Sequence, residues 1–165
     1  MTEDSLPAAT AARDLGVPVA VVRHERVGSL AEAAALRGQE PRDLVKTMVV
    51  RLGAGEYVLV LVPGDRQISW PRLRAMLEQN RLSLAAADEA FAATGYRRGT
   101  ITPFGTTTSL PVIADASIRG RRISLGAGEP GAGLVVDADT ALTALDARVG
   151  PLTEDSAPAR GPAGH

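Results

Sequence analysis

Apolar residues fall along this chain in short runs, and the spacing within each run predicts a type of secondary structure. Five runs rich in β-branched residues predict strands, at 17–24, 44–52, 56–62, 110–115 and 121–126. A sixth strand is predicted at the "LVVD" that ends with Asp137. The tripeptide Gly-Ala-Gly at 53–55 separates two of these runs, which is typical of a β-hairpin.

Helical spacing of apolar residues predicts helices over 5–15, 29–37, 69–79, 87–95 and 139–147. Ser29 and Glu32 have the spacing of a capping box, and Pro71 suits a first helical turn. Most connections between the predicted strands are too short for a parallel crossover. We therefore expect an α+β fold, with a mixed, mostly antiparallel, barrel-like sheet flanked by helices.

The chain of 165 residues is long enough for one domain with a substantial core, predicted over residues 1–150. Residues 151–165 are rich in proline, glycine and alanine and are predicted to form a disordered tail, so deletion from residue 153 onward is expected to be tolerated. The acidic start does not have the pattern of a secretory signal, and no apolar run approaches the ~18 residues of a membrane span. No membrane association is expected, and the cytoplasm is the expected location.

Composition excludes several kinds of chemistry. The absence of cysteine rules out disulfides, thiolate metal sites and a cysteine nucleophile. One histidine outside the tail, His24, and scattered carboxylates do not predict a metal site. No cofactor is expected, because "GAGEPG" fits a dinucleotide-binding spacing but lacks a surrounding β-α-β unit. The net charge of -1 argues against an extended binding interface with nucleic acid, including DNA. It is compatible with a small contact to one RNA end.

Lys46 is the one lysine in a chain that otherwise uses arginine for its basic residues. Alternation along "LVKTMVVRL" groups it with Leu44, Met48, Val50 and Leu52 on an apolar strand face. Two readings are open: a lysine at a strand end that reaches water, or a cation that points toward an interior or a cleft and is held there for an anionic or polar ligand.

The segment "GYRRGTITPFG", residues 95–105, combines three glycines and a proline without looking like a simple hairpin turn. Glycine allows a backbone to approach a ligand closely, and proline fixes the path of the chain. The neighbouring basic residues Arg97 and Arg98, like the cluster Arg119, Arg121 and Arg122, are interpreted as solvated surface.

Four segments, in this order, give the chain a resemblance to a known family: "VKTMVV" (45–50), "VLVLVPGDRQIS" (58–69), "TGYRRGTITPFG" (94–105) and "LPVIAD" (110–115). Together they resemble the YbaK/EbsC (ProX-like) aminoacyl-tRNA deacylases, relatives of the editing domain inserted in bacterial prolyl-tRNA synthetases. The resemblance extends from about residue 17 to 149. It implies that family's fold and the hydrolysis of the ester that links a wrong amino acid to tRNA, an activity that serves translation fidelity.

The resemblance also implies site residues. Lys46 and Gly99 take the catalytic positions, with Lys46 holding the 3′-terminal adenosine region and the Gly99–Pro103 loop surrounding the aminoacyl group. His24 falls where some relatives carry a tyrosine that lines the pocket. The loop "GAGEPGAG" departs from relatives because it has Glu129 and no basic residue, which leaves recognition of the amino group open. The implied substrate-binding residues are His24, Thr47, Thr100, Ile101, Thr102, Pro103, Phe104, Gly105 and Asp115.

Three functions stay open at this point. The leading one is a trans-acting editing hydrolase that deacylates tRNA mischarged with a small amino acid, with tRNA(Pro) first among the candidates. The alternatives are a catalytically inactive module of the same fold that binds tRNA or a synthetase, and a hydrolase of small amino-acid esters. The expected partner is the acceptor end of a mischarged tRNA, and an aminoacyl-tRNA synthetase is a further candidate.

Overall fold

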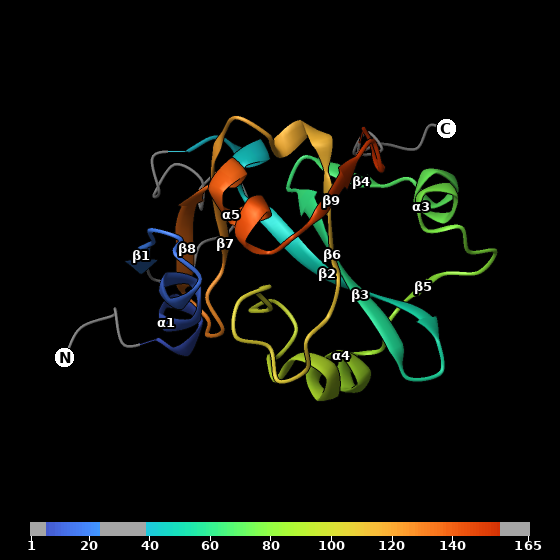
Figure 1. Ribbon diagram of the computed structural model, residues 1–165, viewed down its shortest axis with the longest axis horizontal. Coiled ribbons are helices and arrows are strands. Elements are labelled where there is room, and N and C mark those ends of the chain that lie inside the picture. Colours follow the sequence, from blue (N-terminus) through green and yellow to red (C-terminus); the bar gives the residue numbers. More distant parts are fainter. Residues whose placement is uncertain (1–5, 24–38, 156–165) are drawn as a thin grey trace, which may run out of the picture.

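The computed structural model describes residues 6–23 and 39–155 (Figure 1). His24 and the helix predicted over 29–37 lie outside the described residues. The central element is a hairpin of β2 (Val45–Gly53) and β3 (Glu56–Pro63), joined by a two-residue turn at 54–55. Gly55 has a φ of +74°, a conformation that suits glycine, so the hairpin forms where the sequence predicts it.

The described strands pair into three sheets. The largest has the order β5-β2-β3-β6-β9 and adds β5 (Ser83–Leu84), β6 (Val112–Asp115) and β9 (Arg148–Gly150) to the hairpin. Its β3–β6 and β6–β9 pairs are parallel, while every other ladder is antiparallel. The second sheet has the order β1-β8-β7, and the third pairs β10 with β4; their bounds are Ala20–Arg23 (β1), Arg66–Ile68 (β4), Arg122–Gly126 (β7), Ala132–Asp137 (β8) and Thr153–Asp155 (β10).

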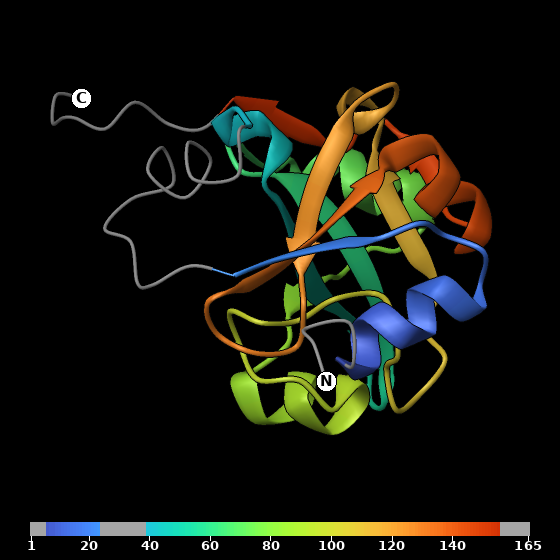
Figure 2. The ribbon, with the colours of Figure 1, turned by 90° about the vertical axis from the view of Figure 1, so that its left-hand side faces the viewer.

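Helices cover this arrangement from several sides. In Figures 1 and 2, α1 (Pro7–Asp14) and α3 (Trp70–Leu77) lie on opposite sides of the β2–β3 hairpin, and α4 (Ala87–Thr94) lies below it. The last helix, α5 (Ala138–Ala144), follows β8 directly. Two short 3-10 turns, η2 (Pro41–Asp43) and η3 (Ala116–Ile118), complete the described elements. The α+β class with a mixed, mostly antiparallel sheet is therefore confirmed, and no described helix has the length and apolarity needed to cross a bilayer.

The two faces of β2 pack against different apolar clusters. Val45 and Val49 belong to the larger cluster, and Thr47 is buried on the same face. Val50 belongs to the smaller cluster on the other face, and Met48 packs against that cluster. Lys46 shares a face with Met48, as alternation predicts, but its side chain is exposed, although its partner across the hairpin, Val62, belongs to the smaller cluster. Of the two places that the sequence left open for an inward-pointing Lys46, the interior is excluded, and the residue borders a pocket instead.

The disordered tail predicted over residues 151–165 begins too early, because residues 151–155 are ordered in the structure. Leu152 is fully buried in the smaller apolar cluster, and Thr153–Asp155 forms β10 against β4. A proline- and glycine-rich composition predicted disorder here, but pairing with β4 and burial of Leu152 order the segment. Residues 151–155 thus belong to the folded unit, and 156–165 lie outside the described residues.

Candidate active site

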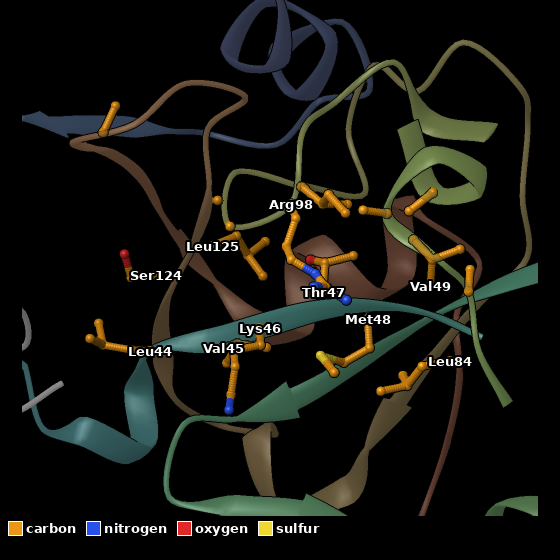
Figure 3. Close-up of a pocket in the computed structure, with 17 residues that line it drawn as sticks. Leu44, Val45, Lys46, Thr47, Met48, Val49, Leu84, Arg98, Ser124 and Leu125 are labelled. Atoms are coloured by element: carbon orange, nitrogen blue, oxygen red, sulfur yellow. The ribbon is translucent and has the colours of Figure 1, made fainter. Parts of the chain in front are cut away.

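A pocket of about 370 Å³ opens beside the first half of β2 (Figure 3). Its walls come from β2, from the loop that follows α4, from the start of α4 and from β7 and β8. Most of the lining is apolar, with a few polar groups, which is typical of a small-ligand site. The lining residues are Leu44, Val45, Lys46, Thr47, Met48, Val49, Leu84, Ala85, Ala87, Ala90, Arg98, Gly99, Ile101, Ser124, Leu125, Gly126 and Ala132.

The start of β2 is held by contacts with β7 and with Arg121, the residue that precedes β7. Asp43, at the end of η2, accepts a 2.6 Å hydrogen bond from Arg121 Nε and one of 3.1 Å from the Glu40 amide. Burial alone would raise the pKa of Asp43, but the bonds from Arg121 and Glu40 outweigh it and lower the pKa, so the carboxylate is ionised. A β-bridge between Leu44 and Ser124 follows. Lys46 and Thr47 are therefore displayed from a fixed piece of backbone.

Thr47 carries an unusual polar atom. The residue is 8% exposed and lines the pocket, yet its Oγ1 has no hydrogen-bond partner within the described part of the chain. A buried hydroxyl without a partner costs free energy. A ligand in the pocket that hydrogen-bonds to Oγ1 would remove that cost, so Thr47 marks a polar contact point in an otherwise apolar wall.

Two cations border the pocket from different elements. Lys46 lies on β2, and the Arg98 side chain extends from the loop after α4 toward that strand (Figure 3). Neither has an ion-pair partner among the described residues. The neighbouring Arg97 differs, because its guanidinium lies 4.9 Å from the centre of the Phe91 ring. Figure 3 shows the Lys46 ammonium on the side of β2 away from Arg98, so the two unpaired positive charges border the pocket from opposite faces of the strand.

The loop 95–105 approaches the pocket with its backbone. Gly99 lines the pocket with a φ of +88°, and a Cβ built on it would meet nothing within 4 Å. The Thr100 carbonyl accepts a 2.9 Å hydrogen bond from the Gly128 amide. A Cβ on Gly126 would lie 2.4 Å from the Ile101 carbonyl oxygen. Glycine at 126 thus permits close packing between the two glycine-rich loops.

The second glycine-rich loop, 126–131, also contains the acidic residue Glu129. Glu129 forms an ion pair with Arg23 of β1. Its charge is therefore partly neutralised by a neighbouring strand. Glu129 is not among the residues that line the pocket.

The structure brings only some of the predicted site residues into the pocket wall. Lys46, Thr47, Gly99 and Ile101 line it. Thr102 and Phe104 are fully buried, Thr100 and Pro103 are buried, and Gly105 is exposed with a φ of +77°. These residues shape the loop, whereas His24 lies outside the described residues. Among the residues described, no group of histidine, cysteine and acidic side chains could hold a metal ion.

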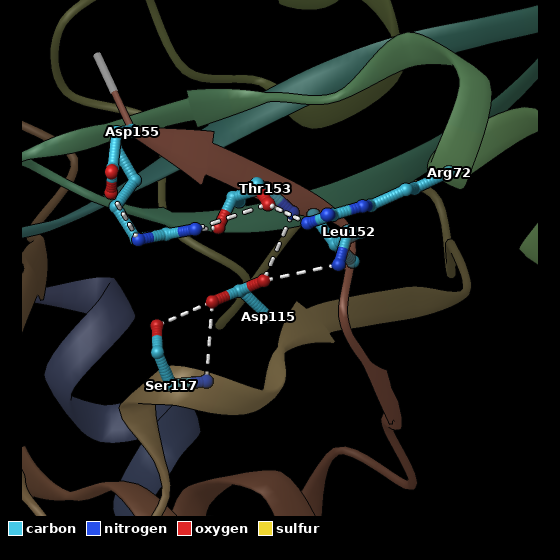
Figure 4. Close-up of polar contacts among 7 residues, drawn as sticks. Arg72, Asp115, Ser117, Leu152, Thr153 and Asp155 are labelled. Carbon is cyan, nitrogen blue, oxygen red and sulfur yellow. Dashed lines mark hydrogen bonds and ion pairs between the residues drawn. The ribbon is translucent and has the colours of Figure 1, made fainter.

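Asp115 is the predicted site residue that the structure reassigns (Figure 4). Its Oδ1 accepts 3.1 Å hydrogen bonds from the amides of Leu152 and Thr153, and its Oδ2 accepts bonds from the amide and hydroxyl of Ser117. Burial alone would raise the pKa of Asp115, but these hydrogen bonds lower it. Asp115 does not line the pocket, and with its acceptor capacity used by the protein it has a structural role.

Sequence reasoning missed Arg98, Ser124 and the apolar residues of β5 and α4 that close the pocket. Arg98 was interpreted as solvated surface, in the same way as Arg97. No local signal distinguishes two adjacent arginines, because the turn at 97–100 decides which one faces β2. Ser124 and Gly126 reach the pocket only because β7 packs beside β2.

Comparison with known proteins identifies the family of this chain. Residues 24–143 match the family model of the aminoacyl-tRNA editing domain, so the chain belongs to that family. It is similar to part of the proline–tRNA ligase of Bacillus licheniformis, with 29% identity over 93 residues, which are 56% of this chain and 16% of the ligase. The ligase of Pelobacter propionicus is 28% identical over 117 residues, or 71% of this chain and 20% of that protein. The chain thus spans a fifth or less of these relatives.

Two solved structures have the same fold. A candidate trans-editing enzyme for prolyl-tRNA synthetase superposes with a TM-score of 0.82 at 23% identity, covering 93% of this chain and 99% of that one. A hypothetical protein superposes with a TM-score of 0.81 at 25% identity, covering 90% and 99% of the two chains. The described fold is therefore shared with both of these structures.

Proposed function

We propose that this protein is a trans-editing hydrolase that deacylates tRNA mischarged with a small amino acid, with tRNA(Pro) as the leading candidate. Its family acts in aminoacyl-tRNA editing, which supports the class of substrate. The observation that carries the proposal is the pocket itself, where the Gly99 loop and the unpaired Arg98 border the buried Thr47 hydroxyl, with Lys46 at the pocket edge on the other face of β2. A cytoplasmic location and contact with a synthetase fit this proposal.

The substrate's parts correspond to the parts of the pocket. Lys46 and Arg98 offer charge to the phosphates and ribose of the RNA end, and Thr47 Oγ1 offers a hydrogen bond to the aminoacyl group. The open side of Gly99 lets backbone groups approach the ester, where N–H donors can stabilise the oxyanion. The apolar lining, with Val45, Val49 and Leu125, suits a small side chain.

The reaction needs no protein nucleophile. Water attacks the ester carbonyl, the bond from the carbonyl carbon to the ribose oxygen breaks, and a proton passes to that oxygen. The products are a free amino acid and a tRNA with its terminal hydroxyl restored. The adjacent ribose hydroxyl can orient the water, while the pocket fixes the ester in place.

The test is a panel of tRNAs mischarged with small amino acids, incubated with the protein while ester loss is followed. We expect faster loss from at least one member, with alanyl-tRNA(Pro) first among the candidates, and no effect on correctly charged prolyl-tRNA. Binding without ester loss across the panel would instead identify an inactive binding module. Equal efficiency on free amino-acid esters would identify a small-molecule esterase.

A further inference from the structure

A second hollow adjoins the pocket along β2. It has a volume of about 310 Å³ and shares Lys46, Met48 and Leu84 with the first. Its other walls come from β3, from β4 with the start of α3, and from β10. The remaining lining residues are Val62, Arg66, Gln67, Ile68, Trp70 and Glu154. We name this set of nine residues the Trp70 groove.

Trp70 distinguishes this groove from the rest of the surface. It is the single tryptophan of the chain, and it packs partly against the smaller apolar cluster while it lines the groove. The other aromatic residues are engaged differently: Phe104 is fully buried, Tyr96 donates its hydroxyl to a backbone carbonyl, and Tyr57 bonds Glu89. Phe91 is exposed, but it lies under Arg97 and lines neither hollow. Trp70 is thus the aromatic surface beside the pocket.

The charged groups of the groove divide into paired and unpaired ones. Arg66 donates to Asp155 at 2.8 Å and to the Thr153 hydroxyl at 2.6 Å. Glu154 accepts from Gln67 at 3.1 Å, and because this amide is neutral the negative charge of Glu154 remains. Lys46, at the boundary of the two hollows, has no ion-pair partner among the residues described. An anionic group that crosses this boundary therefore meets one available cation, and an adjoining flat group meets Trp70.

A single-stranded RNA end has this combination of groups, because its phosphates alternate with bases that stack on aromatic rings. We infer that the Trp70 groove binds the unpaired nucleotides that precede the terminal adenosine, with a base on Trp70 and a phosphate at Lys46. This inference rests on the proposed function, since it assumes that the aminoacyl end occupies the neighbouring pocket. It predicts that the protein binds the nucleotides next to the terminal adenosine as well as the aminoacyl ester.

The single tryptophan allows a direct test that needs no catalysis. Wild-type protein is titrated with the oligoribonucleotide ACCA that carries no amino acid and has a fluorescent label. Tryptophan fluorescence and the anisotropy of the label are followed together. We expect saturable quenching with the same midpoint as the anisotropy change. If the RNA binds with no change in tryptophan fluorescence, or does not bind at all, the groove is not its site.

Variants then separate stacking from general effects. Trp70→Ala should weaken ACCA binding by about tenfold or more, whereas Trp70→Phe should stay within about threefold of wild type. Phe91→Ala, which removes an exposed aromatic outside the groove, should bind as wild type does. Circular dichroism checks that each variant is folded. Wild-type affinity in a folded Trp70→Ala would overturn the inference.

The ester substrates distinguish this inference from the proposed function. On an aminoacylated ACCA oligonucleotide, Trp70→Ala should raise KM about tenfold with little change in kcat, while hydrolysis of aminoacyl-adenosine stays at the wild-type rate. An equal loss on both substrates would contradict the groove. If wild-type protein binds ACCA with quenching but hydrolyses neither ester, the groove assignment stands and the proposed function is wrong.

Discussion

The hydroxyl of Tyr96 donates a 2.7 Å hydrogen bond to the carbonyl oxygen of Phe104, and this bond closes the loop that carries Gly99 and Pro103. The Tyr96 ring also lies against Gly128, where an added Cβ would come within 2.7 Å of it. Burial raises the pKa of Tyr96, so the phenol remains a donor at neutral pH. One side chain thus joins both ends of the loop to the second glycine-rich loop.

Tyr96→Phe removes this hydrogen bond while it keeps the ring against Gly128. We expect a loss of about 1–3 kcal/mol in the free energy of unfolding, because the Phe104 carbonyl loses its side-chain donor. Deacylation should fall because the loop is less well fixed. Thermal melting and hydrogen exchange of residues 96–105 measure the two effects. Unchanged exchange in this loop would show that Tyr96 does not hold it.

Lys46→Ala should lose most deacylation while the fold is kept. A charge-assisted contact to the RNA end contributes about 1.5–3 kcal/mol, which corresponds to roughly a 10- to 150-fold loss in kcat/KM. Because Lys46 is exposed, the free energy of unfolding should change by less than about 0.5 kcal/mol. Lys46→Arg, which keeps the charge but has a broader head group, should be impaired less than alanine. Single-turnover ester loss and thermal melting are the measurements; a fully active Lys46→Ala would refute this role.

Gly99→Ala should reduce deacylation more than stability. The φ of +88° makes alanine strained by about 1–2 kcal/mol, and the new methyl group would enter open space beside backbone that lines the pocket. Gly16→Ala is a matched control, since Gly16 has a φ of +86°, also has nothing within 4 Å of an added Cβ, and does not line the pocket. Both variants should melt at similarly lowered temperatures, with normal activity only in Gly16→Ala. Equal deacylation by Gly99→Ala and Gly16→Ala would show that Gly99 does not contribute to the active site.

Thr47→Val tests the unpartnered hydroxyl. Valine has nearly the same shape, and removal of a buried polar group that lacks a partner should leave the free energy of unfolding unchanged or raise it by up to about 1 kcal/mol. Deacylation should nevertheless fall by about 5- to 20-fold if Oγ1 bonds the aminoacyl group. Thr47→Ser, which keeps the hydroxyl, should recover part of the activity. A stable and fully active Thr47→Val would show that the hydroxyl does not contact the substrate.

Two truncations test the docking of β10. Ending the chain after Asp155 should change the free energy of unfolding by less than about 0.5 kcal/mol. Ending it after Leu152 should cost about 2–4 kcal/mol, because Asp115 and Arg72 lose Thr153 as a partner and β4 loses its neighbour. Chemical denaturation of both proteins gives the difference. Equal stability would mean that β10 contributes little to the fold.

The sequence by itself determined the elements whose signals are local. The hairpin at 45–63 follows from alternation around a glycine turn, and the end of α4 follows from Gly95. The resemblance carried by Lys46 and the 94–105 segment identified the family, because those motifs occur in a fixed order. These inferences need only the identity of neighbouring residues.

Tertiary packing decided the rest. Alternation assigns Lys46 and Thr47 to opposite faces of β2, but apolar clusters lie against both faces of this strand, so only the folded structure shows that Thr47 is buried and Lys46 exposed. Whether Arg97 or Arg98 enters the pocket depends on how the loop packs against β7. The order of residues 151–155 depends on β4 and Asp115, which lie tens of residues away in the chain, and local composition contains no information about such contacts.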